Sequence, residues 1–291
     1  MREAERGLLL LRCRLGEAVH PLSQREYTQL RAVLEGARGE GDDSEVSPEL
    51  LRDLGFEREM AERISGLLNR PQQPKRYLEA QPDISVLTRI SPDFPRRLRS
   101  LGQECPPVLF CKGDLCLLQR PCIALVGSRL LFERGGRFAQ RIGTLAAKEG
   151  YVLVSGNAAG ADRMAQEACL RSGGSVISVV PDALQNCPLR ERQLFLCDEG
   201  YDCTFTASRA LRRNHLIHAL AEKVFVAQCP KPSGGTWSGA EDNLNRGLSP
   251  VYVLDDGSDG ARALWELGAV LVKDDVASLR EQSPSQLSIF D

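Results

Sequence analysis

The chain has 291 residues, of which 42% are hydrophobic and 26% are charged, and its formal net charge is −2. This composition is typical of a globular protein and excludes an extended disordered chain. With so small a net charge, a nucleic acid has to be bound by a local basic patch. No apolar run approaches the roughly 20 residues that cross a bilayer, and the leucines at 8–11 are too few for a signal peptide. We therefore expect a cytoplasmic protein without a membrane partner.

The ten cysteines show no CxxC pair. Those between residues 105 and 122 are spaced more widely than the paired ligands of structural zinc sites. His215 and His218 are three residues apart in a predicted helix, without an obvious thiol or acidic partner. We therefore predict free thiols in a reducing compartment, no metal and no cofactor.

Residues 1–68 are predicted to be a small helical module, because their apolar residues recur at helical spacing. Ser23, followed by Glu26, and Ser47, followed by Pro48, are the expected helix starts. The proline- and glutamine-rich stretch 69–83 is typical of a linker.

From residue 84 the pattern changes to short apolar runs that alternate with helical stretches. We expect an α/β domain over 84–274 with a Rossmann-like doubly wound fold. Its mainly parallel sheet should be covered by helices on both faces. The predicted strands are 122–126, 151–154, 175–180, 223–228 and 250–254. The predicted helices are 134–148, 160–171, 189–196, 209–221, 239–246 and 259–267.

Glycine and small polar residues follow several of these strands. The run 122–126 is followed by Gly127-Ser128-Arg129, the next strand by "SGNAAGAD", and the strand 223–228 by "CPKPSGGTWSGAEDN". Ligands of such sheets bind beyond the carboxyl ends of the strands, and a helix N-terminus without bulky side chains can bind phosphate. The sequence therefore predicts an anion or nucleotide pocket at this edge.

Two common nucleotide signatures are missing from the sequence. No G-x-G-x-x-G follows the first predicted strand, and no G-x-x-x-x-G-K-[ST] occurs anywhere. Hydride transfer and P-loop hydrolysis are therefore disfavoured.

The motifs "ISPDFPRRL", "CPPVLFCKGDL", "IALVGSR", "LVSGNAAGADRMAQEACL", "RRNHLIHALAEKVFVAQ" and "SGGTWSGAEDN" occur in this order over residues 82–272. Together they resemble the DNA-processing protein A (DprA/Smf) family, in which a small helical module of the SAM or helix-hairpin-helix type often precedes the Rossmann-like domain. The resemblance implies a non-enzymatic, cytoplasmic homodimer that binds single-stranded DNA and loads the RecA recombinase in DNA processing, recombination or transformation.

The resemblance also implies the site, a basic pocket for the nucleic-acid backbone. Basic residues are concentrated near the predicted turns, whereas 255–291 is acidic, which agrees with backbone capture. Asp162 is expected to cap a helix or to orient Arg129. The predicted binding residues are Gly127, Ser128, Arg129, Ser155, Gly156, Gly160, Asp162, Arg209, Arg213, Asn214, Gly234, Gly235 and Thr236.

Some positions depart from the family pattern. Gln166 stands where a histidine is usual, Ala159 where an arginine is usual, and Ala210-Leu211 where a phenylalanine–proline pair is usual. The missing aromatic removes a surface on which a base could stack. No winged-helix segment is expected after residue 272.

Two alternatives stay open. The stretch "SGGTWSGAEDN", with Glu241, also resembles nucleotide-handling enzymes that cleave a base from a nucleoside monophosphate (phosphoribohydrolases), and a nucleotide-sensing module is a further alternative. Trp237 is expected either to stack on a base or to pack in the core.

The C-terminal stretch 275–291 is expected to be a flexible tail. It resembles short peptides that dock to the sliding clamp, because an apolar pair and an aromatic on a mobile segment serve as anchors. The expected anchors are Gln286, Leu287, Ile289 and Phe290.

Overall fold

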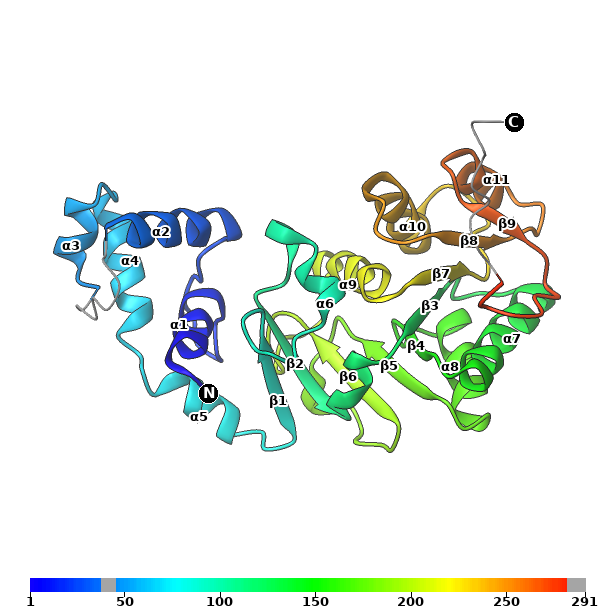
Figure 1. Cartoon of the computed structure of the whole chain (residues 1–291), viewed down its shortest axis with the longest axis horizontal. Helices are drawn as coiled ribbons and strands as arrows, with labels where there is room; N and C mark the ends of the chain where they lie inside the picture. Colours follow the sequence, from blue (N-terminus) through cyan, green and yellow to red (C-terminus); the bar gives the residue numbers. More distant parts are fainter. Residues whose placement is uncertain (38–45, 282–291) are drawn as a thin grey trace.

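The computed structural model describes residues 1–37 and 46–281. Its centre is a nine-stranded sheet in the order β1-β2-β6-β5-β4-β3-β7-β8-β9, with helices on both faces (Figure 1). From β6 to β9 all neighbouring strands are parallel, whereas β2 is antiparallel to β1 and β6. The predicted α/β fold with a mainly parallel sheet and a helical N-terminal part is confirmed. The strands are β1 (Ile84–Thr88), β2 (Val108–Gly113), β3 (Cys122–Val126), β4 (Val152–Ser155), β5 (Ser175–Val179), β6 (Gln193–Cys197), β7 (Lys223–Val226), β8 (Val251–Leu254) and β9 (Val270–Val272).

Successive strand residues pack on opposite faces of the sheet, as a period of two requires. Ile123 of β3 belongs to the core under α7 (Glu133–Glu149) and α8 (Ala161–Arg171), whereas Ala124 belongs to the core under α9 (Ala207–Leu220) and α10 (Gly234–Arg246). A Cβ on Gly143 of α7 would lie 2.1 Å from the carbonyl oxygen of Ala165 in α8. Only glycine therefore allows this pair of helices to approach so closely.

The strand order reverses beside β3. From β3 the chain passes through α7 and α8 to β4 and β5 on one side, whereas β7 pairs with the other side of β3 and leads through α10 and α11 (Asp259–Glu266) to β8 and β9. In doubly wound sheets the crevice at such a switch point is the usual place for a ligand. The carboxyl ends of β4, β3 and β7 are therefore neighbours.

The helix predicted over 189–196 is wrong. Residues Gln193–Cys197 form β6, which is buried along its whole length between β5 and β2. A short apolar run of this kind has no periodicity that separates a buried strand from a buried helix. Strands β1, β2 and β9 were not predicted at all, and they lie toward the two margins of the sheet.

The N-terminal helices form two groups. The helices α2 (Gln24–Ala37), α3 (Pro48–Asp53) and α4 (Arg58–Leu68) enclose a small core around Leu30 and Ile64. The capping box of α2 is present, because Ser23 N donates to Glu26 Oε2 at 2.7 Å and Glu26 N donates to Ser23 Oγ at 3.3 Å. The helix α1 (Glu3–Arg12) joins this core to the sheet, because its Leu11 belongs to the small core and its Leu9 packs beside the sheet, on the left of Figure 1.

The stretch 69–83 is not a bare connection. It contains α5 (Gln73–Glu79), whose Tyr77 is buried in one core with Phe110 of β2. The Tyr77 ring stacks on Tyr201 at a centroid distance of 4.1 Å, and its hydroxyl donates to Asp202. The boundary at residue 68 stays a prediction. Through Tyr77, α5 packs against the loop between β6 and α9.

The segment 274–280 lies along α7. Arg134 pairs with Asp274 at 3.3 Å, and the carboxylate of Glu149 accepts the Leu279 amide at 2.9 Å. The short helix α6 (Arg96–Arg99) contacts α9. Within the described ranges, no helix is both long and apolar enough to span a membrane. The predicted clamp residues Gln286, Leu287, Ile289 and Phe290 lie outside the described residues.

Candidate nucleic-acid interface

Three loops meet at the carboxyl ends of β4, β3 and β7. The Ser128 amide donates to the Gln228 carbonyl at 3.0 Å, which joins the β3–α7 loop to the β7–α10 loop. The Ala161 amide donates to the Ser128 carbonyl at 3.2 Å, which joins the β3–α7 loop to α8. A Cβ on Gly127 would lie 2.7 Å from the Cβ of Ala161. We call Arg129, Asp162, Arg213, Asn214 and residues 233–236 the exit-loop site.

Arg129 is the exposed cation of this site. Its side chain makes no hydrogen bond or ion pair with residues 1–37 or 46–281, yet its charge lowers the pKa of both Asp162 and Arg213. All three charges are therefore close enough to interact. A guanidinium that is exposed and has no carboxylate partner is suited to bind a phosphate.

Asp162 closes the β4–α8 turn from within. Its Oδ2 accepts the amides of Gly156 at 3.0 Å and of Ala158 at 3.3 Å. Burial raises the pKa of its carboxyl to about 6, although the Arg213 charge and these two amides oppose the shift. The carboxylate therefore occupies the amide donors that the sequence suggested for a phosphate.

Arg213 lies against this turn. Its Nη1 is 3.8 Å from Asp162 Oδ2, and its side chain is 12% exposed. A Cβ on Gly156 would lie 1.2 Å from that Nη1, so any larger residue would displace the guanidinium from this position. Burial lowers the pKa of Arg213, with Asp162 opposing, and its buried Nε has no hydrogen-bond partner among the described residues.

The N-terminus of α10 completes the site. Asn214 donates from Nδ2 to the Gly235 carbonyl at 3.0 Å, which fixes α9 to the first turn of α10. Ser233, Gly234 and Gly235 are exposed, and the Ser233 side chain makes no capping hydrogen bond within the described chain. The first amides of such a 13-residue helix carry partial positive charge. Thr236 is half-buried, and Trp237 packs against the core.

Comparison with known proteins gives one consistent result. The family model of DNA recombination-mediator protein A matches residues 85–282. The chain belongs to this family. Protein Smf of Synechocystis is 34% identical over 196 residues, which are 62% of this chain and 49% of the relative. DNA processing protein DprA of Streptococcus pneumoniae is 31% identical over 182 residues, 58% of this chain and 64% of the relative. The chain thus spans about half to two thirds of these two relatives.

Two solved structures support this assignment. DNA processing protein A from Streptococcus pneumoniae covers 94% of this chain and 96% of its own, with a TM-score of 0.72 and 23% identity, which shows the shared fold. DNA processing protein A from Helicobacter pylori, whose structure is described in terms of its single-stranded DNA binding mode, has a TM-score of 0.55 and 28% identity. It covers 65% of this chain and 90% of its own.

In this member of the DNA recombination-mediator protein A family, some predicted site residues support the fold. Ser155 is fully buried, and its Oγ accepts a hydrogen bond from Gln166 Nε2 at 2.6 Å. A Cβ on Gly160 would lie 2.4 Å from the Arg129 carbonyl oxygen, so this glycine makes room for the β3–α7 loop. Arg209 is buried, pairs with Glu199 at 3.0 Å and donates to the Thr204 carbonyl. Ser155 and Arg209 therefore do not face the exit-loop site.

The expected role of Asp162 also needs a correction. It was expected to cap a helix or to orient Arg129, but its direct partners are the amides of Gly156 and Ala158 and the guanidinium of Arg213. A partner from another helix cannot be read from local spacing.

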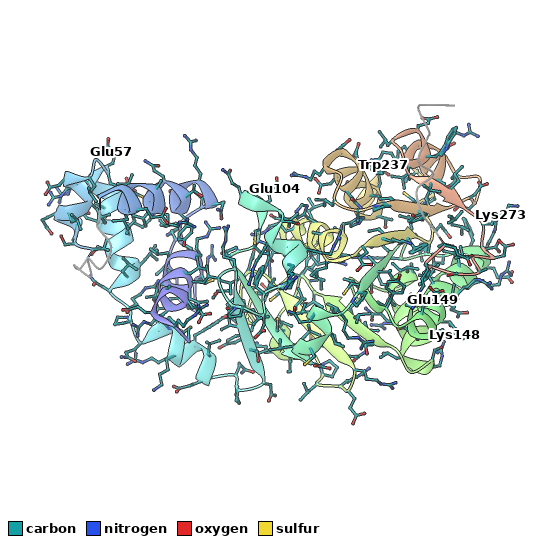
Figure 2. All side chains as sticks on the ribbon, viewed as in Figure 1. Glu57, Glu104, Lys148, Glu149, Trp237 and Lys273 are labelled. Atoms are coloured by element: carbon teal, nitrogen blue, oxygen red, sulfur yellow. The ribbon has the colours of Figure 1, made fainter. Side chains whose placement is uncertain are left out.

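Sequence reasoning missed a large cavity of about 1870 Å³ between the N-terminal helices and α9. Glu104, labelled in Figure 2, is on its wall, as are His215 and Asp242, which lie 2.9 Å apart. Some of its cations are paired with acids of the same wall, as Arg212 is with Asp198 at 2.5 Å, whereas Arg14 and Arg25 on this wall make no ion pair with residues 1–37 or 46–281. We place the candidate site at the strand exits rather than in this cavity, because Arg129 is exposed there at the switch point of the sheet, close enough to Arg213 for the two charges to interact. Within the described ranges, no group of three or more His, Cys, Asp or Glu could hold a metal ion.

Proposed function

We propose that this chain binds single-stranded DNA at the exit-loop site. One observation carries the proposal: at the switch point of a nearly neutral protein, Arg129 is exposed, makes no ion pair with the described residues, and is close enough to Arg213 for their charges to interact. The neighbour of Arg213, Asn214, is bonded to the exposed first turn of α10. Family membership and the described DNA binding of the Helicobacter pylori relative support it. We further propose that binding serves DNA processing in the cytoplasm, with a homodimer that assists RecA loading.

The proposed role of the site is to bind without breaking bonds. Arg129 and the amides of Gly234 and Gly235 contact phosphate oxygens, and Asn214 holds the α10 turn in place. Asp162 is a poor general base for cleavage of a nucleotide, because the residue is only 4% exposed and its Oδ2 already accepts two amides beside Arg213. A base needs an oxygen that can reach the substrate. These contacts favour a binding protein over a phosphoribohydrolase.

The proposal is tested by fluorescence anisotropy with a labelled deoxythymidine oligonucleotide. Arg129→Ala removes one exposed phosphate partner, so we expect roughly tenfold weaker binding, since hydrogen bonds to charged groups contribute about 1.5–3 kcal/mol. The salt dependence should also become shallower, by about 0.7 for each lost phosphate contact on a single strand. Adding Arg213→Ala should weaken binding further, with thermal unfolding used to check the fold.

Arg171→Ala is the matched control, because Arg171 is exposed at the opposite end of α8 and, among the described residues, pairs only with Glu167, at 3.7 Å. We expect it to bind like the unaltered chain. Equal losses in the Arg129 and Arg171 variants would contradict the assignment of the site. Release of free base from nucleoside monophosphates would instead support the enzyme alternative.

A further inference from the structure

The two most exposed large apolar side chains among the described residues lie next to Arg129. Leu130 is 85% exposed and Phe132 is 75% exposed. Both belong to the β3–α7 loop, and Phe132 is the N-cap residue of α7. Neither residue is among the predicted binding residues. An exposed pair of this kind is unfavourable in water unless it contacts another molecule.

The exposure does not result from a loose loop. The Leu130 amide donates to Ser128 Oγ at 3.2 Å. The side chain of Gln228 spans the loop, because its Oε1 accepts the Phe132 amide at 2.8 Å and its Nε2 donates to the Leu130 carbonyl at 3.2 Å. Gln228 is itself only 4% exposed. A buried amide therefore holds the backbone that presents Leu130 and Phe132 to solvent.

A glycine on α7 makes this arrangement feasible. A Cβ on Gly135 would lie 2.8 Å from Gln228 Oε1, so a larger residue would push the glutamine away from the loop. The Gln228 backbone accepts the Ser128 amide at 3.0 Å. One buried residue thus positions both the arginine-bearing turn and the apolar pair.

The chemistry of the neighbours identifies the occupant. A single strand has phosphates along one side and unpaired bases along the other, and each base has an apolar face that stacks on aromatic rings. Arg129 is the phosphate partner, and the apolar pair follows it directly in the chain. An aromatic side chain on a fixed backbone, next to a cation in the chain, is the combination that binds a single strand without reading its sequence.

We propose that Leu130 and Phe132 form a base-stacking platform, on which bases of the strand held at the exit-loop site pack against the Phe132 ring. This inference rests on the proposed function. It adds that the β3–α7 loop contacts the bases of the strand as well as its phosphates. Because stacking on a ring is tolerant of base identity, the platform provides length-dependent binding rather than sequence preference.

The experiment compares two strands of equal length, an oligodeoxythymidine and an abasic deoxyribose-phosphate strand, which has the same phosphates and no bases. Phe132→Ala should weaken binding of the first by roughly 5- to 150-fold, the range that loss of one stacked base gives, and should leave the second unchanged. Phe132→Trp should retain binding of the first strand. Arg129→Ala should weaken both strands alike.

A leucine pair is the matched control. Leu130→Ala should weaken binding of the thymidine strand, whereas Leu189→Ala, at a residue 61% exposed in the loop before β6, should not. Equal losses of Phe132→Ala on both strands, or no loss on either, would overturn the platform and leave the phosphate site standing. Failure of the unaltered chain to bind either strand would overturn both. If Phe132→Ala instead dissociates a dimer in sedimentation, with thymidine affinity unchanged, the pair contacts a second copy and the platform is wrong.

Discussion

The β4–α8 turn and the β7–α10 turn both follow a buried parallel strand and both lead into a helix through glycine. In the first, the carboxylate of Asp162 accepts the amides of Gly156 and Ala158 and lies beside Arg213. In the second, Gly234 and Gly235 are exposed, and Ser233 makes no capping hydrogen bond within the described residues. The β4–α8 turn thus contains its own anion, whereas the amides of the β7–α10 turn are accessible to an external anion.

This difference gives the two turns different roles. The closed turn provides a rigid support, because an internal carboxylate fixes the loop and the position of the Arg213 guanidinium. The exposed turn provides the electrostatic attraction of a helix N-terminus. Their glycines therefore serve different purposes, one to admit a neighbouring side chain and the other to leave backbone amides accessible.

The largest expected effect is a difference in stability when glycine is replaced by alanine in each of the two turns. Gly156→Ala places a Cβ 1.2 Å from Arg213 Nη1, whereas the nearest atom to a Cβ on Gly235 is Asn214 Nδ2, at 3.5 Å. Gly156→Ala should lower the free energy of unfolding by about 3 kcal/mol, because it separates Arg213 from the buried Asp162. Gly235→Ala should change it by less than about 1 kcal/mol. Urea unfolding measures both, and equal stability of the two variants would contradict the comparison.

The second effect depends on pH. In the native state the Asp162 carboxyl has its pKa raised to about 6 from 3.8. Between about pH 4 and 6 the native state therefore holds a proton that the unfolded chain has lost, and stability contributed by Asp162 falls as the pH rises, by about 3 kcal/mol in total. Asp162→Asn should lack this decrease, and should bind single strands more tightly near pH 7.5.

A second group titrates with the opposite sign in this range. Burial lowers the pKa of His218 to about 4 from 6.5. Its contribution to stability is lost as the pH falls from about 6.5 to 4, because the unfolded chain then binds the extra proton. The measurement is therefore the difference in free energy of unfolding between the unaltered chain and Asp162→Asn at each pH, in which the His218 contribution cancels. A constant difference from pH 4 to 7 would contradict the closed-turn description.

The smallest effect is expected from a substitution that gives the exposed turn a carboxylate of its own. Ser233→Asp should place a carboxylate at the N-terminus of α10, where it would accept first-turn amides and stabilise the protein by about 0.5–1 kcal/mol. The same carboxylate should weaken single-strand binding several-fold by competing with phosphate. Ser233→Asn is the control, since it can cap the helix without the charge. Thermal unfolding and anisotropy are the measurements, and equal DNA affinity of the two variants would argue against a phosphate at this turn.

Much of the fold could be predicted from the sequence, because β3, β4, β5, β7 and β8 are buried β-branched runs between amphipathic helices. The strand β6 could not, since "QLFLC" has neither alternation nor helical spacing. The convergence of Gly127 and Gly156 followed from the rule that parallel strands end at one edge, whereas Arg213, which lies within α9, was expected there only from the family resemblance.

The parts of the site that remained hidden depend on tertiary contacts. The Asp162–Arg213 pair joins residues 51 positions apart through the packing of α8 and α9, and Gln228 acts on a loop almost a hundred residues earlier in the chain. Exposure is a further quantity that a local pattern does not provide: an apolar residue such as Phe132 is predicted to be in the core unless the structure shows otherwise.

The stacked pair of Tyr77 and Tyr201 has a consequence for dissecting the molecule. The predicted boundary before residue 84 cuts the chain between those two rings, and it also removes Leu9 and Leu10 from the core that they share with Phe110 and Phe195. A fragment that begins at β1 would leave this flank of the sheet uncovered, with its aromatic side chains in water. The helices that precede the sheet in the sequence therefore partly cover it, and α2, α3 and α4 share their own small core with Leu11 of α1.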